Sequence, residues 1–235
     1  MNKTLIIFST LILALAGCGN NDQTNEVEPT EYIYNFQEDS EDWTAGFADY
    51  PNEPNVEDFY ELEFSHSMLP SPLRITDGAL KQAGNNHSDD LFMFVKKKIT
   101  ELVPYRTYNV SMEIEFASNA SNGATGIGGS PAEDVFIKAG ASTSEPLKVL
   151  DNSDNYYRMN IDKGNQAQDG ANMKLIGDFA NGTESSAYNL VTLKTMNSIS
   201  VESNSNGEIW LVVGTDSGFE GTTTIYYNKI KAILK

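Results

Sequence analysis

Residues that could carry catalytic chemistry are few in this chain. Its 235 residues include one cysteine, Cys18, and two histidines, His66 and His87. Nucleophilic catalysis needs a base within hydrogen-bond reach of a serine or cysteine. His87-Ser88-Asp89-Asp90 groups suitable residue types, but sequence neighbours do not make a triad, and the chain lacks a Gly-x-Ser-x-Gly motif. Soft zinc ligands are also too few. The sequence therefore favours a protein that is not an enzyme.

A glycine-rich stretch at 123–129 is the second candidate for chemistry. Glycines let backbone amides approach a phosphate, but a nucleotide site needs a strand before the loop and a helix after it. Here Ser130-Pro131-Ala132-Glu133 is typical of a single helical turn, and the strand-like Val135-Phe136-Ile137 follows directly. The stretch is therefore interpreted as a surface loop and not as a cofactor site.

Oxygen-bearing side chains are abundant, and calcium is the cation that binds such groups in flexible geometry. The densest group is Asp151-Asn152-Ser153-Asp154-Asn155. It lacks the glycine and the terminal glutamate of an EF-hand loop, so an ordinary solvated turn is the better interpretation. No two carboxylates stand out as a glycosidase pair.

Exposed aromatic rings are the groups with which proteins bind sugars, because sugar C–H groups pack against a ring face. The candidates for such a platform lie in or beside an acidic, proline-containing segment: Trp43, Phe47, Tyr50 and Tyr60. Packing beneath a long loop is the alternative for these rings. Trp210 lies in a run that is apolar on both faces, so we expect it in the core.

The apolar segment near the N-terminus ends at Leu15-Ala16-Gly17-Cys18. It follows a single basic residue, Lys3, and residues 5–16 carry no charge. A basic start, a short apolar stretch and small residues are the layout of a secretory signal. About twelve apolar or small residues are too few for a transmembrane helix, which needs roughly 20. A plain secretory signal with a chance cysteine is the alternative.

These four residues resemble the lipobox of bacterial lipoproteins. In that family the cysteine sulfur carries a diacylglycerol, the chain is cut before the cysteine, and the new amine often receives a further acyl chain such as palmitate. The resemblance implies that residues 1–17 are removed and that Cys18 anchors the protein in a membrane; two or more chains hold stably. Gly19 follows Cys18 where an aspartate favours inner-membrane retention. We therefore expect the outer membrane in a Gram-negative host, and otherwise the outer face of the plasma membrane.

Charge and composition limit the kinds of molecule that this protein is expected to bind. The chain has 33 acidic and 16 basic residues and a net charge of −17, which disfavours nucleic-acid binding because phosphates are repelled. Residues 18–31 are polar and lack aromatics, as in a flexible tether. Residues 32–235 are expected to form one domain.

Alternating apolar and polar residues predict strands in that domain. The clearest strand, 107–116, has five apolar residues at spacing two, with Glu113 and Glu115 on the opposite face. Others are expected at 32–36, 59–67, 79–83, 90–95, 135–139, 147–150, 156–161, 174–176, 190–193, 199–201, 209–213 and 223–234. Turn residues separate them at short intervals, and no helical period is sustained. The fold class is therefore all-β, a single antiparallel β-sandwich resembling a jelly roll.

The start of this domain resembles galactose-binding-like jelly rolls and many carbohydrate-binding modules. The residues that carry the resemblance are Asn35-Phe36-Gln37-Glu38-Asp39 and Trp43, a few positions on. In such modules an acidic residue near this point helps to hold a structural calcium, completed by a polar residue of the last strand. The resemblance assigns these roles to Glu38 and Asn228.

These observations together predict a lipid-anchored protein of the cell envelope that binds a glycan. The alternative is a protein-interaction or structural lipoprotein whose partner is another cell-envelope protein. A lipid-anchored hydrolase is the third.

Overall fold

The computed structural model describes residues 28–74 and 76–235. Within these ranges the chain forms fifteen strands and one four-residue helix. Cys18, the expected signal peptide and most of the expected tether lie outside the described residues. In the described ranges, no helix combines the length and the apolar character needed to cross a membrane.

The strands follow one another closely along the chain. The first half contains β1 (Thr30–Tyr34), β2 (Thr44–Ala48), β3 (Tyr50–Pro51), α1 (Val56–Phe59), β4 (Glu63–Met68), β5 (Gly78–Asn85), β6 (Leu91–Ile99) and β7 (Thr107–Ser118). The second half contains β8 (Val135–Ser142), β9 (Lys148–Asp151), β10 (Tyr156–Met159), β11 (Met173–Asp178), β12 (Asn189–Lys194), β13 (Ile199–Glu202), β14 (Ile209–Ser217) and β15 (Thr222–Leu234).

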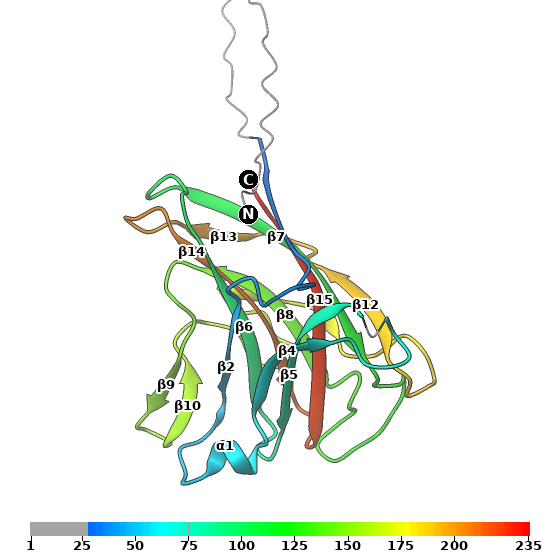
Figure 1. Ribbon diagram of the computed structural model, residues 1–235. Coiled ribbons are helices and arrows are strands. Elements are labelled where there is room, and N and C mark those ends of the chain that lie inside the picture. Colours follow the sequence, from blue (N-terminus) through cyan, green and yellow to red (C-terminus); the bar gives the residue numbers. More distant parts are fainter. Residues whose placement is uncertain (1–27, 75) are drawn as a thin grey trace, which may run out of the picture.

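Two antiparallel sheets pack face to face (Figure 1). The seven-stranded sheet has the order β12-β7-β15-β5-β4, with β1 added to β15 and β13 added to β7. The five-stranded sheet has the order β11-β8-β14-β6-β2. Strands β5 to β8 alternate between the two sheets, and β14 and β15 again lie one in each sheet. The chain therefore crosses repeatedly from one sheet to the other, as in a jelly roll. The expected all-β sandwich is confirmed.

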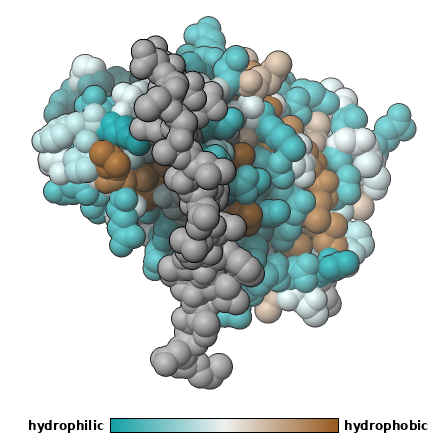
Figure 2. Space-filling model, turned by 90° about the horizontal axis from the view of Figure 1, so that it is seen from above, coloured by the Kyte–Doolittle hydropathy of each residue, from teal (hydrophilic) through white to brown (hydrophobic). Residues whose placement is uncertain are grey.

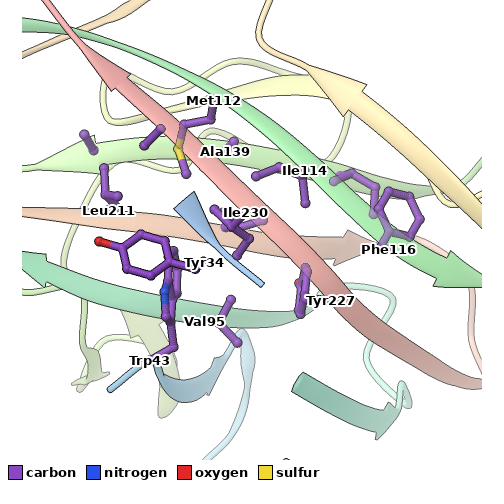
Figure 3. Close-up of a cluster of buried hydrophobic side chains, with 14 of the residues drawn as sticks. Tyr34, Trp43, Val95, Met112, Ile114, Phe116, Ala139, Leu211, Tyr227 and Ile230 are labelled. Carbon is purple, nitrogen blue, oxygen red and sulfur yellow. The ribbon is translucent and has the colours of Figure 1, made fainter. Parts of the chain in front are cut away.

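The main core lies between the two sheets. Tyr227 on β15 and Phe116 on β7 are paired neighbours and are both 0% exposed. Figure 3 shows Tyr34 of the seven-stranded sheet close to Trp43, which directly precedes β2, with Leu211 of the five-stranded sheet in the same layer. The burial pattern of β7 alternates over most of its length, as the sequence predicts for a strand with one face on the core.

A second apolar layer covers the outer face of the five-stranded sheet. Phe92 and Phe94 on β6 stack with ring centroids 5.6 Å apart. Gly46 on the paired strand β2 makes room for this layer, because a Cβ there would lie 2.3 Å from Cζ of Phe94. Met173 of β11 belongs to the same layer, and Ile161 and Met159 of the connection between β8 and β11 pack against it. The connection between β8 and β11, residues 143–172, therefore packs on the sheet; it carries β9 and β10, which join β3 in a small third sheet.

Some sequence expectations differ from the observed elements. Strand β1 begins at Thr30, two residues before the boundary expected for the domain. The strand expected at 59–67 is divided: α1 ends at Phe59, and β4 begins only at Glu63. The amides of Tyr60 and Leu62 donate to the carbonyls of Val56 and Glu57, so this stretch closes a helical turn before the strand. Strands β2 and β3 lie in the acidic, proline-containing segment, where the sequence predicted no strand.

Candidate functional site

The aromatic residues expected to form a platform are packed inside the protein. Trp43 is 1% exposed and lies edge-on to Tyr34, at 5.4 Å between ring centroids. Tyr50 and Tyr60 are 0% and 2% exposed and pack on each other. Phe47 is partly buried against the same cluster. Trp43, Tyr50 and Tyr60 therefore have almost no surface open to a sugar, which is the packed arrangement expected as the alternative, and Phe47 keeps a partly exposed ring.

Trp210 shows the opposite correction, because it lies outside the core. It occupies the outer face of the five-stranded sheet and is half-buried. Lys96 and Lys98 hold their ammonium groups 5.4 and 5.3 Å from its ring centroid. Both faces of this run are apolar in sequence, but only the inner face meets the other sheet.

A cavity of about 650 Å³ lies at one end of the sandwich, where β1, the end of β6 and the start of β7 meet. We call it the tyrosine cavity, since Tyr32, Tyr34 and Tyr108 line it together with Lys97 and Arg106. Its volume falls in the range of small-molecule sites. The corresponding end of the molecule, seen from above in Figure 2, is mostly hydrophilic with separate hydrophobic groups.

The three phenols of this cavity are close neighbours. Burial, followed by Tyr108 and Glu101, raises the pKa of Tyr32. Burial, followed by Tyr32 and Glu41, raises the pKa of Tyr34 to about 12. The hydroxyls of Tyr32 and Tyr34 therefore stay protonated at physiological pH and remain able to donate hydrogen bonds. Tyr32 is only partly buried, so its ring is the accessible one.

The connection between β6 and β7, residues 100–106, forms one wall of the tyrosine cavity. The Tyr108 hydroxyl accepts a hydrogen bond from the Val103 amide at 3.0 Å. The Ser203 hydroxyl accepts from the Arg106 amide at 3.1 Å and donates to the Val103 carbonyl at 2.6 Å. The backbone is thus fixed while Tyr105 stays 68% exposed. Tyr105 is not part of the lining, but its exposed ring directly precedes the lining residue Arg106 in the chain.

A buried charged cluster lies near the opposite end of β6. One oxygen from each of three carboxylates lies within 4.8 Å of the others: Asp49, Asp90 and Asp216. The ammonium of Lys163 is 2.8 Å from Oδ2 of Asp216 and 3.0 Å from Oδ2 of Asp49. Lys138 lies 3.2 Å from the same oxygen of Asp216, and both side chains are 0% exposed.

Charge balance in this cluster argues against a resident metal. Three carboxylates face three cations, because the guanidinium of Arg158 joins the two ammonium groups. Burial acts to lower the pKa of Lys163, but Asp216 and Asp49 outweigh it and the net pKa is raised. Lys163 is therefore charged and lies where a metal would bind. The three carboxylates lie close enough together to hold a metal ion, but that ion would have to displace the ammonium of Lys163 from two of them.

Two of these carboxylates border a cleft of about 260 Å³. Burial and the charge of Asp49 raise the pKa of Asp90 to about 6. However, one nitrogen of Arg158 lies 3.2 Å from an oxygen of each carboxylate. The guanidinium bridges them on one side, so they do not face each other across a gap as a glycosidase pair does.

The residues assigned to calcium by resemblance lie on separate elements. Glu38 is exposed on the connection between β1 and β2. Asn228 lies on β15, where its amide donates to Glu115 at 2.6 Å while its Oδ1 is buried without a hydrogen-bond partner among the described residues. That oxygen suits a cation ligand, but no contact found in the described chain joins Asn228 to Glu38. Calcium at this pair stays a prediction.

The sequence did not predict the residues of the tyrosine cavity or of the buried charged cluster, although it contains a signal for each. Lys138 interrupts an otherwise apolar strand, and Asp216 ends another, which indicates a buried ion pair. Lys97 belongs to a run of three lysines at the end of β6. No sequence rule shows that this run meets β1 and Arg106, because the meeting depends on the strand order.

Comparison with known proteins adds little to this geometry. No known protein family and no curated protein matches the sequence. A putative sugar-binding protein from Bacteroides thetaiotaomicron matches with a TM-score of 0.41 and 8% identity, over 86% of this chain and 92% of that one. The K1 cleaved adhesin domain of Lys-gingipain from Porphyromonas gingivalis matches with a TM-score of 0.40 and 10% identity, over 88% and 98%.

A structure of carbohydrate-binding modules of the β-sandwich superfamily matches with a TM-score of 0.35 and 12% identity, over 85% of this chain and 54% of that one. The chain spans only 19% of a similar bacteriophage tailspike protein. Likenesses at this level carry no argument about activity. The candidate site therefore depends on the residues of this chain alone.

We predict that Asp216→Ala lowers the free energy of unfolding by about 3–5 kcal/mol, because it leaves two buried ammonium groups without their carboxylate. Urea denaturation followed by circular dichroism measures the change. The matched control is Asp154→Ala, which removes a 41% exposed partner of Arg158 and should cost less than about 1 kcal/mol. Equal losses in the two variants would contradict the assignment.

The raised pKa of Asp90 predicts a pH-dependent stability. Folded Asp90 binds its proton more tightly than the unfolded chain does, so its contribution to stability is greatest below pH 4 and is lost as the pH rises through about 6. Asp90→Asn imitates the protonated form. Its stability relative to wild type should rise between pH 4 and pH 7 by roughly 2–3 kcal/mol, measured by urea denaturation across that range. A difference that does not vary with pH would show that Asp90 is not the titrating group.

Proposed function

We propose that this protein is a lipid-anchored module of the cell envelope that binds a glycan in the tyrosine cavity. The observation that carries the proposal is the lining of that cavity. The accessible ring of Tyr32, with Tyr105 exposed on the adjoining wall, lies beside side chains that can donate hydrogen bonds. A sugar needs both kinds of group, because its C–H faces pack on rings and its hydroxyls need polar partners.

The position of the cavity supports the same proposal. Thr30 lies at its rim, and Cys18 precedes Thr30 by twelve residues. A flexible chain of that length has an average end-to-end distance of roughly 20 Å. With an anchor at Cys18, the cavity would be held close to the membrane, within reach of glycans at the cell surface.

A protein-binding function is the second candidate, supported by strand β9. It is an edge strand of the small third sheet, with one side unpaired by the described residues. Val149 and Leu150 on it are 43% and 40% exposed. An exposed edge strand with apolar side chains can pair with an extended segment of a partner. The tyrosine cavity has more of the groups that define a site, so the glycan is preferred.

A glycan array tests the main proposal. Wild-type protein should bind a limited set of glycans, and Tyr32→Ala should weaken that binding about tenfold or more because it removes the accessible ring. The control is Phe59→Ala, since Phe59 is 62% exposed on α1 at the other end of the molecule. It should bind as wild type does.

Equal binding by wild type and Tyr32→Ala would contradict the assignment of the cavity. Wild-type protein that binds no glycan at all would contradict the proposed function and leave the β9 edge as the better-supported contact.

The anchor is tested separately by metabolic labelling. Cells that express the full chain with radiolabelled palmitate should yield labelled protein in the membrane fraction. Cys18→Ser should lose the label and leave the membrane, because no other residue of the chain carries a thiol. Labelling that persists in the variant would exclude Cys18 as the lipidated residue.

A further inference from the structure

We propose that the tyrosine cavity recognises an acidic saccharide, one whose sugar ring carries a carboxylate, through the guanidinium of Arg106 and the ammonium of Lys97. This inference depends on the proposed glycan-binding function and narrows its ligand. The evidence is the excess of positive charge in the cavity lining and the hydrogen-bond donors that Arg106 and Lys97 leave unused.

The charge of the cavity is opposite to that of the chain. The whole sequence has 33 acidic and 16 basic residues. The cavity is lined by three basic residues, Lys97, Lys98 and Arg106, and by one acidic residue, Glu101. Such a local excess of positive charge attracts anions even when the net charge of the protein is negative.

Arg106 is the cation with the most unused capacity. Its guanidinium lies 5.4 Å from the ring centroid of Tyr108. Across the described ranges, no carboxylate comes within ion-pair distance of it, and only its backbone amide and carbonyl make hydrogen bonds. A guanidinium presents five donors in a planar fork that fits a carboxylate bidentately. The contact with the Tyr108 ring orients the guanidinium of Arg106 without using its N–H donors.

Lys97 is the second cation, and it is only weakly neutralised. Its ammonium lies 5.9 Å from the ring centroid of Tyr34. It donates to the Glu41 carbonyl at 2.7 Å and to Oδ2 of Asp42 at 3.1 Å. Asp42 is 96% exposed, so this ion pair is in water and contributes little. An ammonium has three donors, which leaves one for a ligand.

The other charged groups at the cavity do not neutralise the positive charges of Arg106 and Lys97. Lys98 directs its ammonium to the outer face of the sheet, 3.4 Å from a carboxylate oxygen of Glu208. Glu101 is the one carboxylate of the lining and lies close enough to Tyr32 to raise its pKa, so it offsets only part of the positive charge of Lys97 and Arg106. Lys97 and Arg106 therefore line the cavity together with the accessible ring of Tyr32. A ring that stacks on Tyr32 and carries a carboxylate satisfies all three residues.

Titration calorimetry on the full chain in detergent tests this inference. The probes are trisaccharides of galacturonate, glucuronate and mannuronate, each compared with its carboxyl-reduced, neutral counterpart. At least one acidic form should bind ten times or more tightly than its neutral counterpart, and this preference should fall as salt is raised. Arg106→Gln should remove most of the preference, and Lys97→Met a smaller part.

Arg74→Gln is the matched control. Arg74 is exposed on the connection before β5, away from the cavity, and its replacement should leave the preference unchanged. Thermal unfolding of each variant shows that the fold is intact.

The possible results distinguish a failure of the acidic-ligand inference from a failure of the proposed glycan binding. A glycan bound equally well in acidic and neutral form, or an Arg106→Gln variant that keeps the full preference, would overturn the acidic ligand while glycan binding stands. Binding only of neutral glycans from the array would do the same. Binding of no glycan of either kind would overturn both.

Discussion

The buried carboxylate of Asp216 is the charge on which the outer face of the five-stranded sheet depends. Its Oδ2 accepts from Lys163 at 2.8 Å and from the Gln166 amide at 2.9 Å. Lys138, which also lies beside it, donates to the carbonyls of Lys163 and Gln168. Apolar packing has no direction, so these bonds decide how residues 143–172 sit on the sheet. The two sheets form the scaffold, and the charged cluster determines the position of residues 143–172 on the outer face of the five-stranded sheet.

Strand β6 separates the two sites of the molecule. Asp90 lies just before its first residue, and Lys97 lies near its last, so the cluster and the tyrosine cavity are separated by most of a nine-residue strand. At about 3.3 Å per residue, this distance is more than 20 Å. One end of the sandwich therefore holds a buried charge cluster, while Lys97, Lys98 and Arg106 line an open cavity at the other end. A change at one end need not disturb the other.

The sequence predicted the framework well and the sites poorly. The alternation in 107–116 specifies a strand with one buried face, and β7 has that pattern because local periodicity and tertiary packing agree there. Trp43 and Trp210 were assigned the wrong way round, because exposure depends on which face of a strand meets the other sheet. Tyr32, Lys97 and Arg106 come from three segments that only the strand order brings together, so no local pattern could group them.

Strand β1 determines how the domain would bear a mechanical load. It pairs antiparallel with the end of β15, from Thr30 opposite Leu234 to Tyr34 opposite Ile230. A pull on the chain before Thr30, directed along the strand, loads these pairings together in shear instead of opening them one at a time. Because the tyrosine cavity adjoins the same strand, such a force would act on β1 and on the strand paired with it, directly beside the cavity. The force would also act on the core side chains that these two strands carry, such as Tyr34 and Ile230.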